Sequence, residues 1–311
     1  MDRFEFTGEP SYLRLHGEGK LAPRIRQAQE LLRNCCLCPR QCNVDRTAGQ
    51  RGFCRSGHLA KVAAAHAHFG EEAPLVGQGG SGTIFMSSCN LLCSFCQNYE
   101  ISHLSEGREV EPAHLSALML QLMGRGCHNI NFVTPTHFVP QILHALGIAV
   151  EAGLNIPLVY NCGGYESVET LRLLESIFDI YMPDFKFWDE KWADLYCKAP
   201  DYRVHATAAI QEMHRQVGNL LIDPDGLAIR GLLVRHLVMP GGVANSKEIL
   251  NFIAREVSPE TYVNVMAQYH PCGAASGDEI INRRITRSEY IQAIDWAIEA
   301  GLTRLDSRSR I

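Results

Sequence analysis

The run Ser87-Ser88-Cys89-Asn90-Leu91-Leu92-Cys93-Ser94-Phe95-Cys96-Gln97-Asn98 places three cysteines in the spacing C-x3-C-x2-C. This spacing suits one metal cluster wrapped by one loop. An iron-sulfur cluster is normally held by four cysteines, so a loop that supplies three leaves one iron open to a small molecule. A structural zinc ion would need four protein ligands. The competing interpretation is that the three thiols occur together by chance or belong to a zinc site.

The residues before this loop predict a strand that ends at the cysteines. A glycine-rich stretch, 77–82, precedes the apolar run Thr83-Ile84-Phe85-Met86. Glycine clusters that flank a short β-branched and aromatic run are typical of a strand. The loop would then lie at the carboxyl end of that strand, which is where barrel enzymes place their chemistry.

Further along the chain, strand-like runs alternate with amphipathic segments, which predicts an α/β fold with parallel strands and crossover helices. A turn at Pro224-Asp225-Gly226 predicts a small hairpin before the fifth strand. The expected strands are 83–88, 129–135, 156–162, 179–185, 231–239 and 261–269. The expected helices are 24–33, 112–125, 139–152, 167–178, 193–217, 246–257 and 287–300.

The triad, with aromatic Phe95 before its last cysteine, resembles the cluster loop of the radical S-adenosylmethionine (SAM) superfamily. The resemblance implies a partial (β/α)6 open barrel and a [4Fe-4S] cluster on Cys89, Cys93 and Cys96. It also implies that SAM binds the open iron and is cleaved reductively to a radical that abstracts hydrogen from a substrate. An external electron donor such as flavodoxin or ferredoxin is implied with it.

A second group of cysteines, Cys35, Cys38, Cys42 and Cys54, precedes the barrel segment and predicts a closed metal site. Four thiolates fit either structural zinc or an auxiliary iron-sulfur cluster, and the spacing does not separate the two. Cys36 is an alternative to Cys35, although Cys35-x2-Cys38 is the usual chelating step. We therefore expect a cysteine-rich metal-binding module over 1–75 and the core domain over 76–311.

The phrase Cys38-Pro39-Arg40-x-Cys42 with downstream Gly52-Phe53-Cys54 resembles the N-terminal extension of the pyruvate formate-lyase activating enzyme-like subfamily. That resemblance implies an oxidoreductase that activates a glycyl-radical enzyme, with a protein as substrate. The four-cysteine module differs from the short activases, so radical modification of a small molecule or of another polypeptide stays as an alternative. A third alternative, from a different class, is a non-enzymatic iron-sulfur or zinc protein that transfers electrons or binds a partner.

Polar residues at the expected strand ends are the candidate SAM and substrate ligands. Asp184 and Lys186 share one face of an extended segment and match the Asp-x-Lys pair of the activating enzymes, which implies a catalytic role. Arg235 puts a permanent charge in an apolar strand, which is costly unless it meets an anion, and the SAM carboxylate is the expected one. The remaining candidates for cofactor binding are Thr134, Thr136, Asn161, Gln268 and His270.

Several other residues have two interpretations. Glu71 and Glu72 either hold a cation beside the cluster or form a helix cap and a solvated acidic turn. His137 is interpreted as a helix-start residue. Four isolated cysteines are interpreted as ordinary thiols, namely Cys127, Cys162, Cys197 and Cys272.

Composition places the chain among globular proteins, with 311 residues, 46% hydrophobic and 20% charged. No apolar run reaches the roughly 18 residues of a membrane span, and Met1-Asp2-Arg3-Phe4-Glu5-Phe6 lacks the form of a signal peptide. Twelve cysteines without such a signal favour reduced thiols and metal sites, so a cytoplasmic location is expected. A net charge of −5 offers no overall electrostatic footprint for nucleic acid.

Overall fold

The computed structural model describes residues 8–309, and its strands form a single mixed sheet. Within these residues the strand order is β10-β9-β8-β6-β5-β4-β2-β1-β3, with β7 paired to β8 at the side. The strands are β1 Ala60–His68, β2 Ser81–Met86, β3 Arg108–Val110, β4 Ile130–Val133, β5 Leu158–Cys162, β6 Ile180–Pro183, β7 Leu221–Ile222, β8 Ala228–Leu237, β9 Tyr262–Met266 and β10 Arg304–Leu305.

The six strands expected from the sequence are β2, β4, β5, β6, β8 and β9, and each pairs in parallel with the next. Every residue of β5, β6 and β9 is buried, as expected for parallel strands whose faces are both covered. The strand path ends at β3 on one side and at β10 on the other, so the sheet is open. These observations confirm the prediction of an open α/β barrel with six parallel β/α units.

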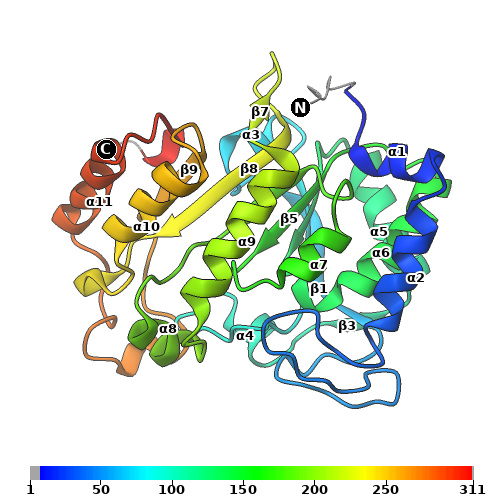
Figure 1. Ribbon diagram of the computed structural model, residues 1–311, viewed down its shortest axis with the longest axis horizontal. Helices are drawn as coiled ribbons and strands as arrows, with labels where there is room; N and C mark the ends of the chain where they lie inside the picture. The colour runs from blue at the N-terminus through cyan, green and yellow to red at the C-terminus, as the bar shows by residue number, and fades with distance from the viewer. Residues whose placement is uncertain (1–7, 310–311) are drawn as a thin grey trace.

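Crossover helices cover the outside of this sheet (Figure 1), with α9 in front of the sheet between α5 and α6 on one side and α10 and α11 on the other. Short 3-10 turns occupy Thr136–Phe138, Pro240–Gly242, Gly273–Gly277 and Ser307–Ser309, and a π turn spans Ile253–Val257. The helices are α1 Ser11–Gly17, α2 Leu21–Glu30, α3 Ala73–Val76, α4 Tyr99–Ser102, α5 Pro112–Gly124, α6 Val139–Glu151, α7 Val168–Leu173, α8 Glu190–Cys197, α9 Tyr202–Val217, α10 Ser246–Phe252 and α11 Arg287–Glu299.

The expected helix over 193–217 is two helices, α8 and α9. Lys198 ends α8 in the left-handed conformation at φ 51°. Pro200 follows, and proline lacks the amide hydrogen that a continuous helix needs and disfavours helical geometry in the residue before it. The chain therefore turns between the two helices.

The N-terminal segment is joined to the barrel more closely than the expected boundary at residue 75 implies. Strand β1 pairs antiparallel with β2, and α2 packs against α6. The Ala-rich sequence of β1 contains one β-branched residue, Val62, so it gives no strand signal. Figure 1 shows the irregular cysteine-rich loop lying beside α4 and β3, at one end of the sheet.

The hairpin expected at Pro224-Asp225-Gly226 is present. Strand β7 pairs antiparallel with β8, and Gly226, at φ 85°, donates its amide hydrogen to the carbonyl of Asp223 over 3.0 Å. Glycine adopts this left-handed conformation without the steric cost that a Cβ brings.

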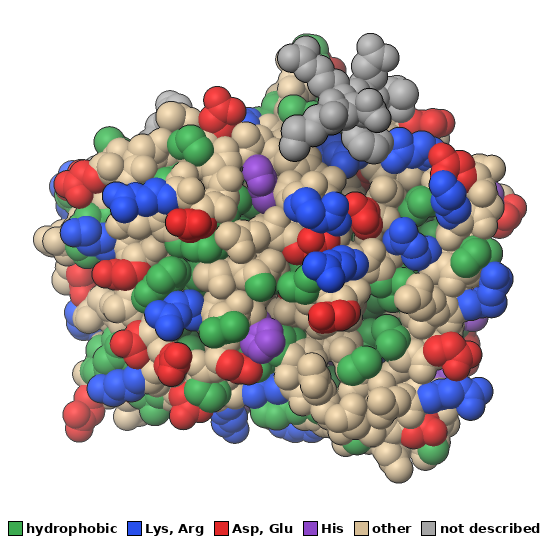
Figure 2. All heavy atoms as spheres, viewed as in Figure 1, with side chains coloured by type: hydrophobic (Ala, Val, Ile, Leu, Met, Phe, Trp, Pro, Cys, Tyr) green, Lys and Arg blue, Asp and Glu red, His purple; other side chains and the backbone are tan. Residues whose placement is uncertain are grey.

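No helix in residues 8–309 has the length and apolar character needed to cross a membrane. The segment Met1-Asp2-Arg3-Phe4-Glu5-Phe6, on which the signal-peptide expectation rests, lies outside the described residues. On the face drawn in Figure 2, basic and acidic side chains are interspersed. That face carries no continuous basic surface of the kind that binds nucleic acid.

Asp179, which is 1% exposed, connects the N-terminal helix α1 to the sheet. Its carboxylate accepts hydrogen bonds from the backbone amides of Ser11, at 2.8 Å, and Leu158, at 3.3 Å. We predict that Asp179→Ala lowers the free energy of unfolding by about 2–5 kcal/mol, because it leaves two buried amides without an acceptor. Urea unfolding measures this. Exposed Glu299→Ala is the control, and an equal effect of the two changes would contradict the prediction.

Candidate active site and a second cysteine pocket

A cavity of about 410 Å³ opens at the carboxyl ends of the parallel strands. Open α/β sheets bind their ligands at this edge. Residues from the ends of six different strands line it, among them Cys89, Thr134, Asn161, Asp184, Arg235 and Gln268. The cavity therefore brings together residues that are far apart in the sequence.

The three triad cysteines, Cys89, Cys93 and Cys96, all line this cavity. Hydrogen bonds to sulfur hold two of them: the Leu91 amide donates to Cys89 Sγ at 3.3 Å and the Ser102 hydroxyl donates to Cys96 Sγ at 3.2 Å. Phe95 is 5% exposed and packs its ring edge against Phe187 at 5.8 Å, which anchors the loop on the barrel.

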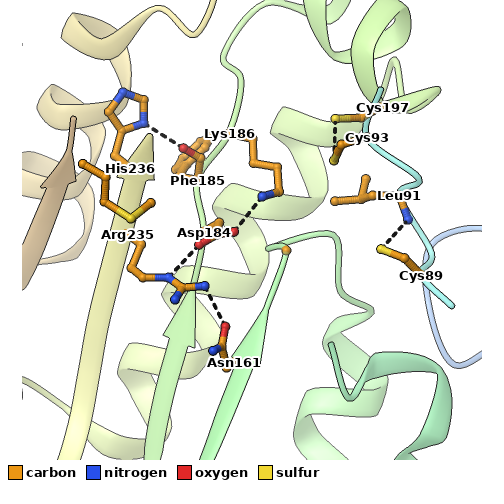
Figure 3. A network of polar contacts seen from close by, with 12 residues as sticks. Cys89, Leu91, Cys93, Asn161, Asp184, Phe185, Lys186, Cys197, Arg235 and His236 are labelled. Atoms are coloured by element: carbon orange, nitrogen blue, oxygen red, sulfur yellow. Dashed lines mark hydrogen bonds and ion pairs between the residues drawn. The ribbon is translucent and has the colours of Figure 1, made fainter. Parts of the chain in front are cut away.

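Four polar residues form a connected array on the opposite wall (Figure 3). The Asp184 carboxylate accepts from Arg235 Nε at 2.8 Å through one oxygen and from Lys186 Nζ at 2.6 Å through the other. Arg235 Nη2 donates to Asn161 Oδ1 at 2.7 Å. Figure 3 shows the Lys186 side chain between Asp184 and the loop that carries Cys93.

Asp184 and Lys186 are 16% and 18% exposed, so they form a largely buried ion pair. An exposed ion pair would contribute little to stability. Burial opposes ionisation of Asp184, but the Arg235 guanidinium and the Lys186 ammonium together hold its pKa below the usual range. Burial also opposes the charge on Lys186, and Asp184 keeps its pKa well above the usual range. The array is therefore fully charged at neutral pH.

The sequence predicts that the SAM carboxylate neutralises Arg235, but Asp184 already pairs with Arg235 within the chain. A second carboxylate, Glu71, lies 3.6 Å from Arg235 Nη1. Burial raises the pKa of Glu71 to about 7 in spite of this cation. Three acidic side chains, Asp184, Glu71 and Glu72, therefore act on Arg235, and Lys186 is the second cation of the array.

Glu71 and Glu72 are 8% and 3% exposed, so the expectation of a solvated acidic turn is wrong. Glu72 precedes α3 without a side-chain cap hydrogen bond, and its Oε1 accepts from Asn264 at 2.9 Å. Glu71 contacts Arg235 of β8 and Glu72 contacts Asn264 of β9, so both carboxylates lie inside the protein. These contacts join distant parts of the chain, and the local sequence does not predict them.

The other predicted cofactor ligands divide into two groups. Thr134, Asn161 and Gln268 line the cavity, and Thr134 adopts φ 59° while its amide donates to the Asn161 carbonyl at 2.8 Å. Thr136 and His270 are not among the lining residues. The Thr136 hydroxyl is buried and donates to Glu166 at 2.7 Å, away from the cavity.

Two residues near the array were missed by the sequence analysis. Cys197, interpreted as an ordinary thiol, places its Sγ 3.2 Å from Cys93 Sγ. The Tyr202 hydroxyl lies 2.9 Å from the carbonyls of Gly163 and Asp184, so it ties the ends of β5 and β6 together. Both residues come from the helices α8 and α9, about 100 residues after the triad, so no local spacing connects them to it.

Gly164 shows why the second glycine of Asn161-Cys162-Gly163-Gly164 is required. It adopts φ 80°, and a Cβ there would lie 2.3 Å from the Asp184 carbonyl oxygen and 2.8 Å from the Tyr202 hydroxyl. No Cβ fits at those separations, so only glycine allows the end of β5 to approach β6 this closely.

The N-terminal cysteines line a second and much smaller cavity of about 10 Å³. Cys35, Cys38, Cys42 and Cys54 all line it, and Cys36 does not. A Cβ on Gly52 would lie 2.6 Å from Cys42 Sγ, which explains the glycine at this position. Within residues 8–309 no three His, Cys, Asp or Glu side chains already stand in the arrangement of a metal site, so the thiols must rotate inward to bind one.

The loop that carries the N-terminal cysteines packs directly on the triad loop. Arg40 stacks over the Phe53 ring at 3.9 Å, and its Nε donates to the carbonyl of Asn90 at 3.0 Å. Asn90 follows Cys89 and also lines the small cavity. The two cysteine groups are therefore neighbours in the fold, although more than thirty residues separate them in the sequence.

Comparison with curated proteins finds a relative of this chain. It is 32% identical over 284 residues to the "Uncharacterized protein MJ0674" of Methanocaldococcus jannaschii, a match that covers 88% of this chain and 77% of the relative. The chain belongs to the same family as MJ0674. No protein-family profile matches it.

Two solved structures have a similar arrangement of elements. One is described as native anSMEcpe with bound AdoMet and Cp18Cys peptide; it is 10% identical, with a TM-score of 0.45 over 70% of this chain and 60% of that chain. The other is methylornithine synthase (PylB), 16% identical, with a TM-score of 0.42 over 72% of this chain and 70% of that chain. This chain therefore spans less than two thirds of the first structure. Similarities at these scores do not bear on function.

Glu166 is a buried carboxyl group with hydrogen-bond partners from β5 and from the turn after β4. It is 1% exposed and accepts from Thr136 at 2.7 Å and from the Tyr160 hydroxyl at 2.9 Å. Burial raises its pKa to about 7 from the ordinary 4.5. Because the folded-state pKa is the higher one, ionising Glu166 costs stability, and this cost is absent below pH 4.5 and complete above pH 7.

We predict that Glu166→Gln becomes more stable relative to the unaltered protein as pH rises from 4.5 to 7, by about 1.4 kcal/mol per pH unit. Urea unfolding of both proteins across this range measures the difference. Glu299→Gln, an exposed carboxyl control, should show no such trend. A pH-independent difference for Glu166→Gln would contradict the assigned cause.

Proposed function

We propose that this protein is a radical SAM enzyme that binds a [4Fe-4S] cluster on Cys89, Cys93 and Cys96. The observation that carries the proposal is that this triad and the charged array of Asp184, Lys186 and Arg235 line one cavity. Its volume, about 410 Å³, lies in the range of small-molecule sites. The donor set fits the cluster because three thiols come from one loop and face the same space.

When bound, the cluster supplies the electron that splits SAM into methionine and a carbon radical. The chain's own residues bind and orient SAM. Lys186 and Arg235 present positive charge to its carboxylate. The Thr134 carbonyl and the Glu71 carboxylate are acceptors for its ammonium, and Asp184 holds the two cations in place.

For the substrate, we propose a protein glycine, as in glycyl-radical enzyme activation, with Asp184 and Lys186 beside the target. The Asp-x-Lys pair is the support, since both side chains line the same cavity as the triad. A small molecule or another polypeptide is the alternative. The experiment incubates enzyme that contains the cluster and SAM with deuterated candidate substrates of both classes. Only the true substrate transfers deuterium to 5'-deoxyadenosine, so the labelled product identifies the substrate class.

One observation favours a second function. Cys197 Sγ, 3.2 Å from Cys93 Sγ, offers a fourth thiol next to the triad. If Cys197 were a ligand, the cluster would have four protein ligands and no open position for SAM, as in an electron-transfer protein. The two functions therefore differ in whether Cys197 is needed to hold the cluster.

We predict that Cys89→Ala, Cys93→Ala and Cys96→Ala each abolish formation of 5'-deoxyadenosine after anaerobic reconstitution, reduction and addition of SAM. Cys197→Ala is the matched control, because it removes a buried thiol that lies 3.2 Å from Cys93 Sγ, and it should keep the cluster and the activity. SAM cleavage by a triad variant would contradict the proposal that these cysteines hold the catalytic cluster. Loss of the cluster in Cys197→Ala, with no SAM cleavage by the unaltered protein, would support the electron-transfer function.

We predict that Lys186→Met weakens SAM binding by roughly tenfold or more, since one charge-assisted hydrogen bond contributes about 1.5–3 kcal/mol. The melting temperature should change little, because Asp184 keeps Arg235 as its partner. Asp184→Asn should reduce both affinity and melting temperature, because it removes the ion pair of Lys186 and one of the two ion pairs of Arg235. Anaerobic calorimetric titration and thermal melting measure the two quantities. Exposed Lys247→Met is the control, and unchanged affinity in Lys186→Met would refute the role of Lys186.

A further inference from the structure

His137 has one ring nitrogen without a hydrogen-bond partner in the interior of the protein. Among the described residues two histidines are buried, His137 at 2% exposure and His236 at 0%. Both nitrogens of His236 have partners, the Phe185 carbonyl and the Ser246 hydroxyl, each at 2.8 Å. In His137 only Nε2 has one, the Ser87 carbonyl at 2.8 Å, and Nδ1 has none. An orphaned buried nitrogen is costly and calls for a ligand.

The hydrogen bond of His137 fixes which nitrogen holds the proton. A backbone carbonyl only accepts, so Nε2 must be the donor to Ser87. The ring is neutral, because the carbonyl of this enclosed residue already accepts from the buried Arg46 guanidinium, and an imidazolium as a second buried cation there would be costly. Nδ1 then carries a lone pair. A histidine that ligates a metal typically donates its other N–H to a carbonyl in this way.

His137 lines the small cavity together with the four N-terminal cysteines. The cavity thus contains four thiols and one imidazole, which are the ligand types that Zn²⁺ prefers. Its volume of about 10 Å³ is close to that of one water-sized sphere. A single ion fits such a space.

We propose that the N-terminal pocket binds one metal ion of the zinc class, with His137 Nδ1 as a ligand beside cysteine thiolates. This inference rests on the N-terminal cysteines being metal ligands, as their spacing in the sequence predicts. A tetrahedral ion takes four donors, so three of the four thiols join His137. Three thiolates, a neutral imidazole and Zn²⁺ sum to one negative charge, and Arg46, which also lines the cavity, offsets it.

The proposed ligand also connects the two cysteine sites. Ser87, whose carbonyl accepts from His137, lies two residues before Cys89, at the start of the triad loop. Arg46 donates to the His137 carbonyl at 2.6 Å and, with two of its nitrogens, to the Gly57 carbonyl. A metal ion that fixes the His137 ring therefore also fixes the point from which the triad loop departs.

The test uses full-length protein with Cys89, Cys93 and Cys96 all changed to alanine, so that only the N-terminal site remains. After chelator treatment, Co²⁺ is added and its stoichiometry, visible spectrum and X-ray absorption are measured. We expect one Co²⁺ per chain, with about three sulfur neighbours near 2.3 Å and one nitrogen neighbour near 2.0–2.1 Å. In His137→Ala the nitrogen neighbour should be absent, and in exposed His144→Ala it should remain.

Sulfur-only coordination in the protein that retains His137 would overturn the inference and leave the N-terminal cysteine site intact. The X-ray absorption of the protein that retains His137 tests the inference even if His137→Ala fails to fold. Failure to bind Co²⁺, or iron with acid-labile sulfide in this protein as isolated anaerobically, would overturn the single-ion site. In either case the radical SAM proposal is tested separately, by measuring 5'-deoxyadenosine formation in the protein with an intact triad.

Discussion

The burial of one carboxylate between two cations is the constraint on which the candidate active site depends. Asp184 is hydrogen-bonded to both Arg235 and Lys186, and all three are less than one fifth exposed. Removing one partner from a buried pair costs about 3–5 kcal/mol, because the other charge stays buried without compensation. The array therefore holds the carboxyl ends of β6 and β8 in register and places the side chains of Lys186 and Arg235 on the cavity wall.

The backbone around Asp184 follows from this constraint. The amide of Phe185 donates to the Arg235 carbonyl at 2.8 Å, and the Tyr202 hydroxyl lies 2.9 Å from the carbonyls of Gly163 and Asp184. Gly164 allows these segments to approach because a Cβ would collide with Asp184. Three strand ends are thus held together by a few polar contacts, and the triad loop faces them across the cavity. Rigid support of this kind is what an oriented cofactor requires.

The N-terminal cysteine segment is a part of the same structure and not a separate attachment. Arg40 and Asn90 join it to the triad loop, and His137, which lines the small cavity, donates to the Ser87 carbonyl. Strand β1 continues the sheet beyond β2. Stability of the N-terminal pocket and placement of the triad are therefore physically linked through shared residues, whichever metal each holds.

The sequence by itself determined the parallel strands and most crossover helices, because hydrophobic periodicity is a local property and buried parallel strands are nearly continuous apolar runs. It also indicated both cysteine groups, whose members are close in the chain. Tertiary structure alone decided that Asp184 neutralises Arg235, that Glu71 is buried beside them, that Cys197 lies against Cys93, and that His137 faces the N-terminal cysteines. Each of these contacts joins residues that are 51 to 164 positions apart. They come together only through the packing of strands and helices, which no local sequence pattern specifies.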